Sequence, residues 1–175
     1  MSMFCFQCQE ASKGTGCTIK GICGKPDDVA NLQDLLIYLM KGISLYGVEG
    51  RKLGVVNKEA DEFIMNGLFA TITNANFNKN IFAARVKKGL RLRDQLKDQL
   101  AKKGGNVEAI DHDAALWTGD SLEDFEAKAP HVGVLSTENQ DIRSLRELII
   151  YGLKGMAAYA AHADALGYEK DDIFA

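Results

Sequence analysis

Residues 35–46, LLIYLMKGISLY, and residues 148–159, LIIYGLKGMAAY, carry one pattern twice, 113 positions apart (148 minus 35). Apolar residues recur in both copies at spacings of three and four, which is typical of an amphipathic helix. Chance similarity between two amphipathic helices is the simpler alternative, but the matched tyrosine, lysine and glycine positions count against it. The ungapped register extends beyond both copies: Leu32 pairs with Leu145, and Leu53-Gly54 pairs with Leu166-Gly167. The chain is therefore expected to begin the same helical bundle twice.

The sequence around the first copy predicts an all-α domain. Pro26 followed by two aspartates suits a helix start, and Gly47 with Gly50 suggests its end. The periodicity predicts helices at residues 26–47, 59–74 and 79–103. Because the links between them are short, we expect an antiparallel three-helix bundle over residues 26–103.

Residues 104–136 have weaker periodicity, and we expect a connector with one short helix near residues 121–129, capped by Ser121. Thr137 and Gln140 resemble a capping box that would open a long helix from about residue 138 to 165. Residues 137–175 would then supply the first helix of a second, incomplete bundle. The apolar face of that helix needs cover. We expect the first bundle, another copy of the chain or a missing C-terminal region to cover four residues: Leu148, Ile149, Leu153 and Met156.

All four cysteines of the chain lie in its N-terminal loop, residues 1–25, at positions Cys5, Cys8, Cys17 and Cys23. The spacing is Cys-x2-Cys-x8-Cys-x5-Cys, in which the first pair can chelate one corner of a metal site. The glycines of this loop would let the other two cysteines swing in. An excess of positive charge would suit an anionic cluster, and three apolar side chains could shield it from water. The cations are Lys13, Lys20 and Lys25, and the shielding residues are Phe4, Phe6 and Ile22.

Three kinds of site can be built from four cysteines. Zinc ribbons usually present two Cys-x2-Cys pairs, and this loop has one, so the spacing favours an iron–sulfur centre while leaving structural zinc open. Disulfides would not persist in a reducing compartment.

Composition and charge argue against several classes of function and location. The chain has 175 residues, a net charge of −3 and 26% charged residues, which argues against non-specific nucleic-acid binding. The sequence contains no apolar run of the roughly 18 residues that a membrane span needs. Its start does not have the pattern of a secretory signal. We therefore expect a cytoplasmic protein with no nucleic-acid or membrane partner.

The loop FCFQCQE…GCTIKGICGKP is followed by ANLQDLLIY, GLFATITNANF, WTGDS and STENQDIRSLRELIIYGLKGMAAYAAHA. These segments resemble the N-terminal region of the hybrid-cluster proteins, also called prismane proteins or hydroxylamine reductases. The resemblance implies an N-terminal domain of two three-helix bundles. It also implies that Cys5, Cys8, Cys17 and Cys23 bind a [4Fe-4S] cluster. Family members with longer cysteine spacing hold a [2Fe-2S] cluster instead.

The same resemblance implies a function for the complete protein, which would reduce hydroxylamine to ammonia or nitric oxide to nitrous oxide. The N-terminal cluster would relay electrons to a hybrid cluster whose ligands lie in downstream domains absent from this chain. Alone, the chain is expected to be inactive and to have no catalytic residue. Its expected partners are an electron-donor protein and the missing C-terminal domains or another copy of the chain. The non-enzyme alternative is a structural zinc module whose helices mediate protein assembly.

Overall fold

The computed structural model describes residues 3–168 and 170–174, and it has the predicted all-α fold. Within these residues the only extended pairing is an isolated bridge between Cys5 and Cys17. Short 3-10 turns lie at Ser12–Gly14, Val107–Ala109, Ala129–His131 and Val134–Ser136. The α-helices are α1 (Asp27–Lys52), α2 (Lys58–Ile72), α3 (Lys79–Lys102), α4 (Asp113–Leu116), α5 (Leu122–Lys128), α6 (Gln140–Ala165) and α7 (Asp171–Phe174).

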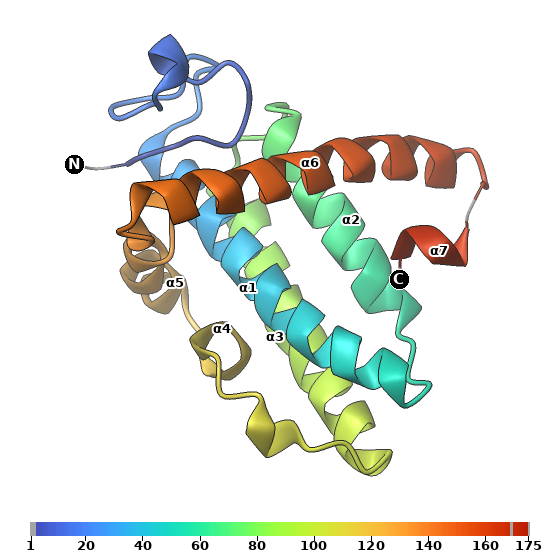
Figure 1. Cartoon of the computed structure of the whole chain (residues 1–175). Coiled ribbons are helices and arrows are strands. Elements are labelled where there is room, and N and C mark those ends of the chain that lie inside the picture. Colours follow the sequence, from blue (N-terminus) through green and yellow to red (C-terminus); the bar gives the residue numbers. More distant parts are fainter. Residues whose placement is uncertain (1–2, 169, 175) are drawn as a thin grey trace.

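Helix α1 lies at the centre of the molecule. Helix α3 runs along it, α2 contacts both of them, and the short helices α4 and α5 cover a further side of α1 (Figure 1). Because α1 is covered on several sides, its buried residues extend around the helix rather than along one stripe. Helix α6 crosses this group and packs mainly on α2.

Two helix ends differ from the sequence predictions. Helix α1 continues to Lys52, so the predicted end at Gly47 is wrong. Gly47 and Gly50 are buried within the helix, and the chain turns at Gly54, whose φ is 71°. The predicted capping box at residues 137–140 is also wrong, because Asn139 is the cap of α6. The predicted cap of α5 is confirmed, since Ser121 forms a capping box.

The sequence repeat has an exact counterpart in the helices. Helices α1 and α6 are both 26 residues long. Their first residues differ by 113 positions (140 minus 27), and so do their last residues (165 minus 52). Each is followed by a glycine with positive φ, 71° at Gly54 and 78° at Gly167. The two copies therefore begin and end their helices at equivalent positions.

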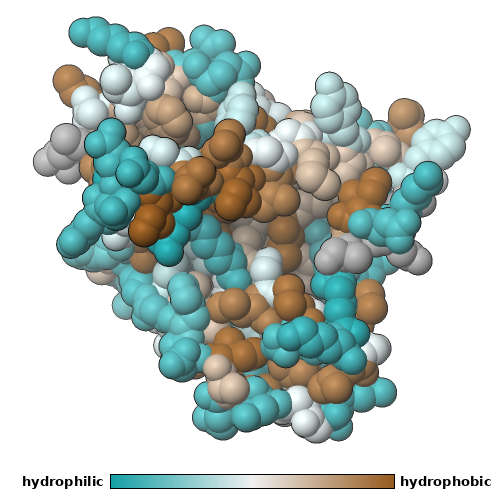
Figure 2. Space-filling view, in the orientation of Figure 1, coloured by the Kyte–Doolittle hydropathy of each residue, from teal (hydrophilic) through white to brown (hydrophobic). Residues whose placement is uncertain are grey.

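Burial distinguishes the two copies. Leu35, Leu36 and Ile43 of α1 are at most 1% exposed, whereas their α6 equivalents are exposed by 67%, 63% and 57%. Those equivalents are Leu148, Ile149 and Met156. Figure 2 shows hydrophobic side chains along the course of α6 on the surface. The first bundle therefore does not cover these residues or Leu153, so this one of the three predicted alternatives is wrong. Helix α6 meets α2 through another face, which contains Ala157 and Ala161.

In the first copy, Tyr38, Gly42 and Tyr46 form a stripe that contacts α4. The Tyr38 hydroxyl donates to the Asp113 carboxylate, and the Tyr46 hydroxyl donates to the Ala115 oxygen at 3.5 Å. Between the tyrosines, Gly42 lets the Ala114 carbonyl come close to the helix. The equivalent glycine in α6 has open space beside it, and the second tyrosine of that copy is exposed.

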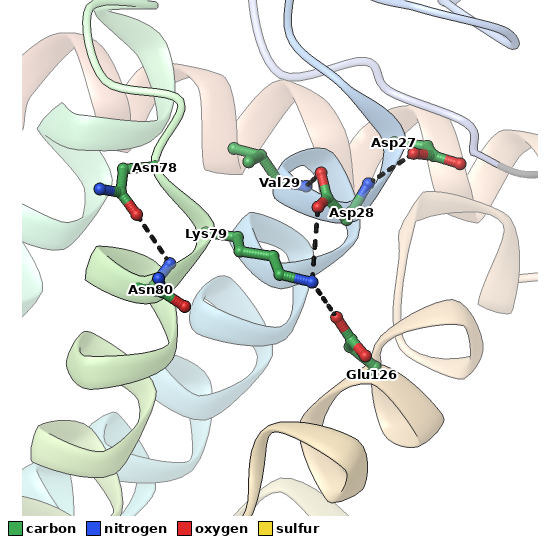
Figure 3. Close-up of polar contacts among 7 residues, drawn as sticks. All are labelled: Asp27, Asp28, Val29, Asn78, Lys79, Asn80 and Glu126. Carbon is green, nitrogen blue, oxygen red and sulfur yellow. Dashed lines mark hydrogen bonds and ion pairs between the residues drawn. The ribbon is translucent and has the colours of Figure 1, made fainter.

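The start of α1, next to the cysteine loop, is tied to two other helices (Figure 3). The Lys79 ammonium lies 2.9 Å from a Glu126 carboxylate oxygen and 3.8 Å from one of Asp28. Lys79 opens α3, and the side chain of the preceding residue, Asn78, accepts from the Asn80 N–H at 3.0 Å. These contacts hold the first turns of α1 and α3 beside α5.

No helix in the described residues is both long enough and apolar enough to cross a bilayer.

Gly42 and Gly155 provide a matched test of the difference between the copies. A Cβ atom on Gly42 would lie 2.0 Å from the Ala114 carbonyl oxygen, whereas one on Gly155 would meet nothing within 4 Å. We predict that Gly42→Ala lowers the free energy of unfolding by about 1–3 kcal/mol through overpacking. Gly155→Ala should be neutral or stabilising by up to about 1 kcal/mol. Urea denaturation measures both, and equal effects of the two substitutions would contradict the difference in packing.

Candidate metal centre

The two arms of the N-terminal loop are joined at Cys5 and Cys17. The N–H of each residue donates to the main-chain oxygen of the other, at 2.9 Å in both directions. Both side chains are buried, and together with Met3 they pack against Ala30 in the first turn of α1. The loop therefore stands on the N-terminal end of α1 (Figure 1).

Gly16 shapes the loop immediately before Cys17. Its φ of 133° is unfavourable for other residues, and a Cβ atom there would lie 2.7 Å from the Phe4 ring. Phe4 therefore covers the loop at this point. The predicted shielding by Phe6 and Ile22 is not found, because both of these side chains are exposed.

The four thiols have different surroundings. Cys5 and Cys17 are buried, Cys8 is half-buried, Cys23 is exposed, and all four are free. The Ser12 N–H donates to the Cys17 sulfur at 3.4 Å. Among the residues that the structure describes, no three His, Cys, Asp or Glu side chains are grouped so that they could hold a metal ion. The loop thus pairs the backbones of Cys5 and Cys17 without gathering three cysteine sulfur atoms around one point.

A buried polar network lies beneath the loop and is organised by Gln7, between the first two cysteines. The Gln7 amide nitrogen donates to the Asp34 carboxylate at 2.6 Å and to the Ala30 carbonyl at 3.2 Å. Its side-chain oxygen accepts from the Lys25 ammonium at 2.9 Å. Its main-chain oxygen accepts from the Lys154 ammonium at 3.1 Å. This network connects both ends of the cysteine loop to α1 and α6.

The network places positive charge under the loop. Of the three lysines predicted to balance a cluster, Lys13 and Lys20 are exposed, but Lys25 is 1% exposed. Lys154, which sequence reasoning did not select, is 2% exposed. Asp34 is the buried carboxylate of this set, so two buried ammonium groups face one buried carboxylate.

Burial dominates the acid–base properties of these groups. It raises the pKa of Cys5, while the nearby Lys25 lowers that pKa. Burial also raises the pKa of Asp34 to about 6, opposed by the Gln7 hydrogen bond and by Lys154. The pKa of Lys154 is lowered to about 8 by burial. In each case the environment disfavours the charged form, as expected away from water.

The charged groups also follow the repeat. Asp34 is equivalent to Glu147, and Lys41 is equivalent to Lys154 (147 minus 34 and 154 minus 41 are both 113). Burial raises the pKa of both carboxyl groups. Lys154 lowers the pKa of Asp34, and Lys41 lowers the pKa of Glu147. The carboxylate of each copy therefore lies near the lysine of the other copy, Asp34 near Lys154 and Glu147 near Lys41.

Sequence reasoning identified the thiols but missed Gln7, Asp34 and Lys154. One signal was available for the two charged residues, because each interrupts a largely apolar face of a repeat helix. No local pattern marks Gln7, whose partners lie up to 147 positions away.

The donor set fits a thiolate-bound metal cluster. Four unpaired thiols lie on one loop, a backbone N–H points at one sulfur, and an excess of buried positive charge lies underneath. Thiolates are the ligands of iron–sulfur clusters and of structural zinc.

Comparison with known sequences decides the family. The sequence profile of the Prismane/CO dehydrogenase family matches residues 3–175. The chain belongs to this family. It is 65% identical over 175 residues to a hydroxylamine reductase of Desulfitobacterium hafniense (strain Y51), with all of this chain and 32% of the relative covered.

Two further relatives are also named hydroxylamine reductase. The protein from Clostridium novyi (strain NT) is 58% identical over 174 residues, covering 99% of this chain and 32% of the relative. The protein from Clostridium botulinum (strain Kyoto / Type A2) is 51% identical over 198 residues, covering all of this chain and 35% of the relative. The chain thus spans about a third of the length of these relatives.

The buried Asp34 predicts a pH dependence of stability. Because the folded-state pKa is raised from 3.8 to about 6, the folded chain keeps a proton that the unfolded chain has released. The protonated carboxyl stabilises the fold fully below about pH 4, and this contribution is lost as the pH rises through about 6. We predict that the free energy of unfolding of the metal-free chain falls over this interval.

Asp34→Asn should make that fall smaller and leave the part that comes from Glu147, whose pKa is also raised by burial. Urea denaturation in a pH series under reducing conditions measures the change. Asp98→Asn, on the exposed surface of α3, is the control and should leave the pH dependence unchanged. An unchanged slope in Asp34→Asn would contradict the raised pKa.

Proposed function

We propose that this chain is an electron-transfer module that holds an iron–sulfur cluster through Cys5, Cys8, Cys17 and Cys23. The observation that carries the proposal is the position of four free thiols on one loop above two buried ammonium groups. Membership of the Prismane/CO dehydrogenase family supports it. We propose a [4Fe-4S] cluster because the cysteine spacing is short, with [2Fe-2S] and zinc as the competing occupants.

Electrostatics supports an anionic occupant. Burying an ammonium group without a counter-charge is costly. Among the fully buried groups, Lys25 and Lys154 exceed the charge of Asp34, because Glu147 beside Lys154 is only half-buried. Deprotonated cysteines would supply the missing negative charge. Burial raises the pKa of Cys5, and Lys25 offsets part of that effect by lowering it.

When bound, an iron–sulfur cluster accepts one electron and passes it on. The residues of this chain would set the conditions for that exchange. The Ser12 N–H donates toward the Cys17 sulfur, and hydrogen bonds to sulfur are one determinant of cluster potential. Burial of Cys5 and Cys17 keeps water away from two of the four ligands.

For the complete protein we propose hydroxylamine reduction, the activity in the names of its relatives. The reducing centre would be a hybrid cluster held by residues outside these 175. We therefore assign no catalytic residue to this chain and expect it to relay electrons from a donor protein. The cytoplasm is the compartment we propose, because thiols stay reduced there. The net charge of −3 gives no reason to propose a nucleic-acid partner.

The exposed face of α6 is the contact we propose with the rest of the protein. Its residues repeat those of α1 that are fully buried, and the relatives are about three times as long as the chain. An apolar groove of about 920 Å³ adjoins this face, lined by residues that include Ile37, Met40, Ile150 and Leu153. A second copy of the chain is the competing occupant.

Metal analysis tests the cluster directly. We predict about four irons and four acid-labile sulfides per chain after purification without oxygen. Two irons and two sulfides per chain would indicate a [2Fe-2S] cluster instead of a [4Fe-4S] cluster, and stoichiometric zinc would contradict the proposal. Cys17→Ser should lose the visible absorbance and some stability, since metal binding contributes to folding. Thr15→Ala, on the exposed surface of the same loop, is the control and should retain the cluster.

Leu148→Gln tests the proposed contact. In the 175-residue chain, where Leu148 is 67% exposed, the substitution should change the free energy of unfolding by less than about 0.5 kcal/mol. In a fusion to the remaining part of the Desulfitobacterium hafniense relative, it should cost about 2–5 kcal/mol. Val56→Gln, at an equally exposed residue, should have little effect in both. The same small cost of Leu148→Gln in both proteins would contradict the contact.

A further inference from the structure

Helix α6 binds both neighbours of Cys8. On one side the Lys154 ammonium donates to the main-chain oxygen of Gln7 at 3.1 Å. On the other side the Tyr151 hydroxyl donates to the side-chain oxygen of Gln9 at 2.7 Å. These two α6 residues are three positions apart, so they lie on one face of the helix.

The same region of the loop is fixed to α1. The Gln7 side chain binds Asp34 and Ala30 of α1, and it accepts from Lys25 near the far end of the loop. The segment around Cys8 is therefore held between the two repeat helices. By contrast, Cys5 and Cys17 are joined to each other by backbone hydrogen bonds, which do not involve α6.

We propose that Lys154 and Tyr151 are positioning residues that couple the seating of α6 to the placement of Cys8 as a ligand. This inference rests on the proposed function, in which Cys8 binds the cluster. Because coupling between two events is reciprocal, cluster binding stabilises the seating of α6, and release of α6 weakens the cluster.

The burial of Lys154 explains why cluster binding and the seating of α6 should stabilise each other. Lys154 is 2% exposed, its hydrogen bond goes to a neutral carbonyl, and no ion pair involves it in the described residues. The charges around it are Asp34 from α1, Glu147 from α6, and Lys25 and Cys5 from the loop. Adding thiolate charge in the loop stabilises a buried ammonium, so the cluster and the seated α6 favour each other.

The repeat supplies a matched control for this proposal. Lys154→Met removes the ammonium but keeps an unbranched side chain, and Lys154→Arg keeps the charge. Lys41→Met makes the same change at the equivalent position of α1, where the lysine is exposed. Tyr151→Phe removes the second contact at a partly exposed residue, so it tests the coupling even where Lys154→Met fails to fold.

The first measurement uses the metal-free chain under anaerobic reducing conditions. Alkylation of each cysteine by iodoacetamide is followed over time by peptide mass spectrometry. Lys154→Met and Tyr151→Phe should raise the alkylation rate of Cys8 several-fold and leave that of Cys23 unchanged. Lys41→Met should match the unmodified chain. Equal Cys8 rates in all variants would overturn the proposal.

The second measurement uses the reconstituted chain and records the cluster's midpoint potential and its rate of loss to an iron chelator. Lys154→Met should lower the potential and speed cluster loss several-fold, and Lys154→Arg should restore both toward the original values. A merely structural role would leave the potential unchanged, and that result would overturn the proposal. If the chain bound no cluster, the proposed function would fail, while the alkylation rates would still decide the coupling.

Discussion

The burial of α1 on several sides is the constraint on which the rest of the fold depends. Helix α3 runs along it, the backbone of α4 fits against Gly42, and the cysteine loop packs on Ala30. A helix of this kind cannot be moved without disturbing every element that covers it. The loop therefore has a fixed base, because the residues beneath it belong to the first two turns of the central helix.

The two copies of the repeat use equivalent residues for different purposes. In α1, Tyr38 and Gly42 hold the α4 segment. In α6, the equivalent Tyr151 and the nearby Lys154 reach the cysteine loop instead. The carboxylate of each copy lies near the lysine of the other, but only the pair Asp34 and Lys154 is buried and belongs to the charged base of the site. Helix α6 is thus both a support for the loop and an exposed surface.

Local patterns predicted much of this arrangement. Apolar spacing located the long helices and placed their starts within a few residues, although the capping box predicted for α6 was wrong. The end of α1 was placed too early, since Gly47 and Gly50 fit inside a helix whose neighbours pack closely. The four cysteines were evident from their spacing. The roles of Gln7 and Lys154 were not, because a buried hydrogen bond between residues 147 positions apart leaves no periodic trace.

The central claim is that the four thiols of residues 1–25 together bind iron. The most direct test is an anomalous difference map, recorded at the iron absorption edge from crystals grown without oxygen. The account predicts one strong iron peak in contact with the sulfur atoms of Cys5, Cys8, Cys17 and Cys23. A peak that appears only at the zinc edge, or an iron peak away from the loop, would contradict it.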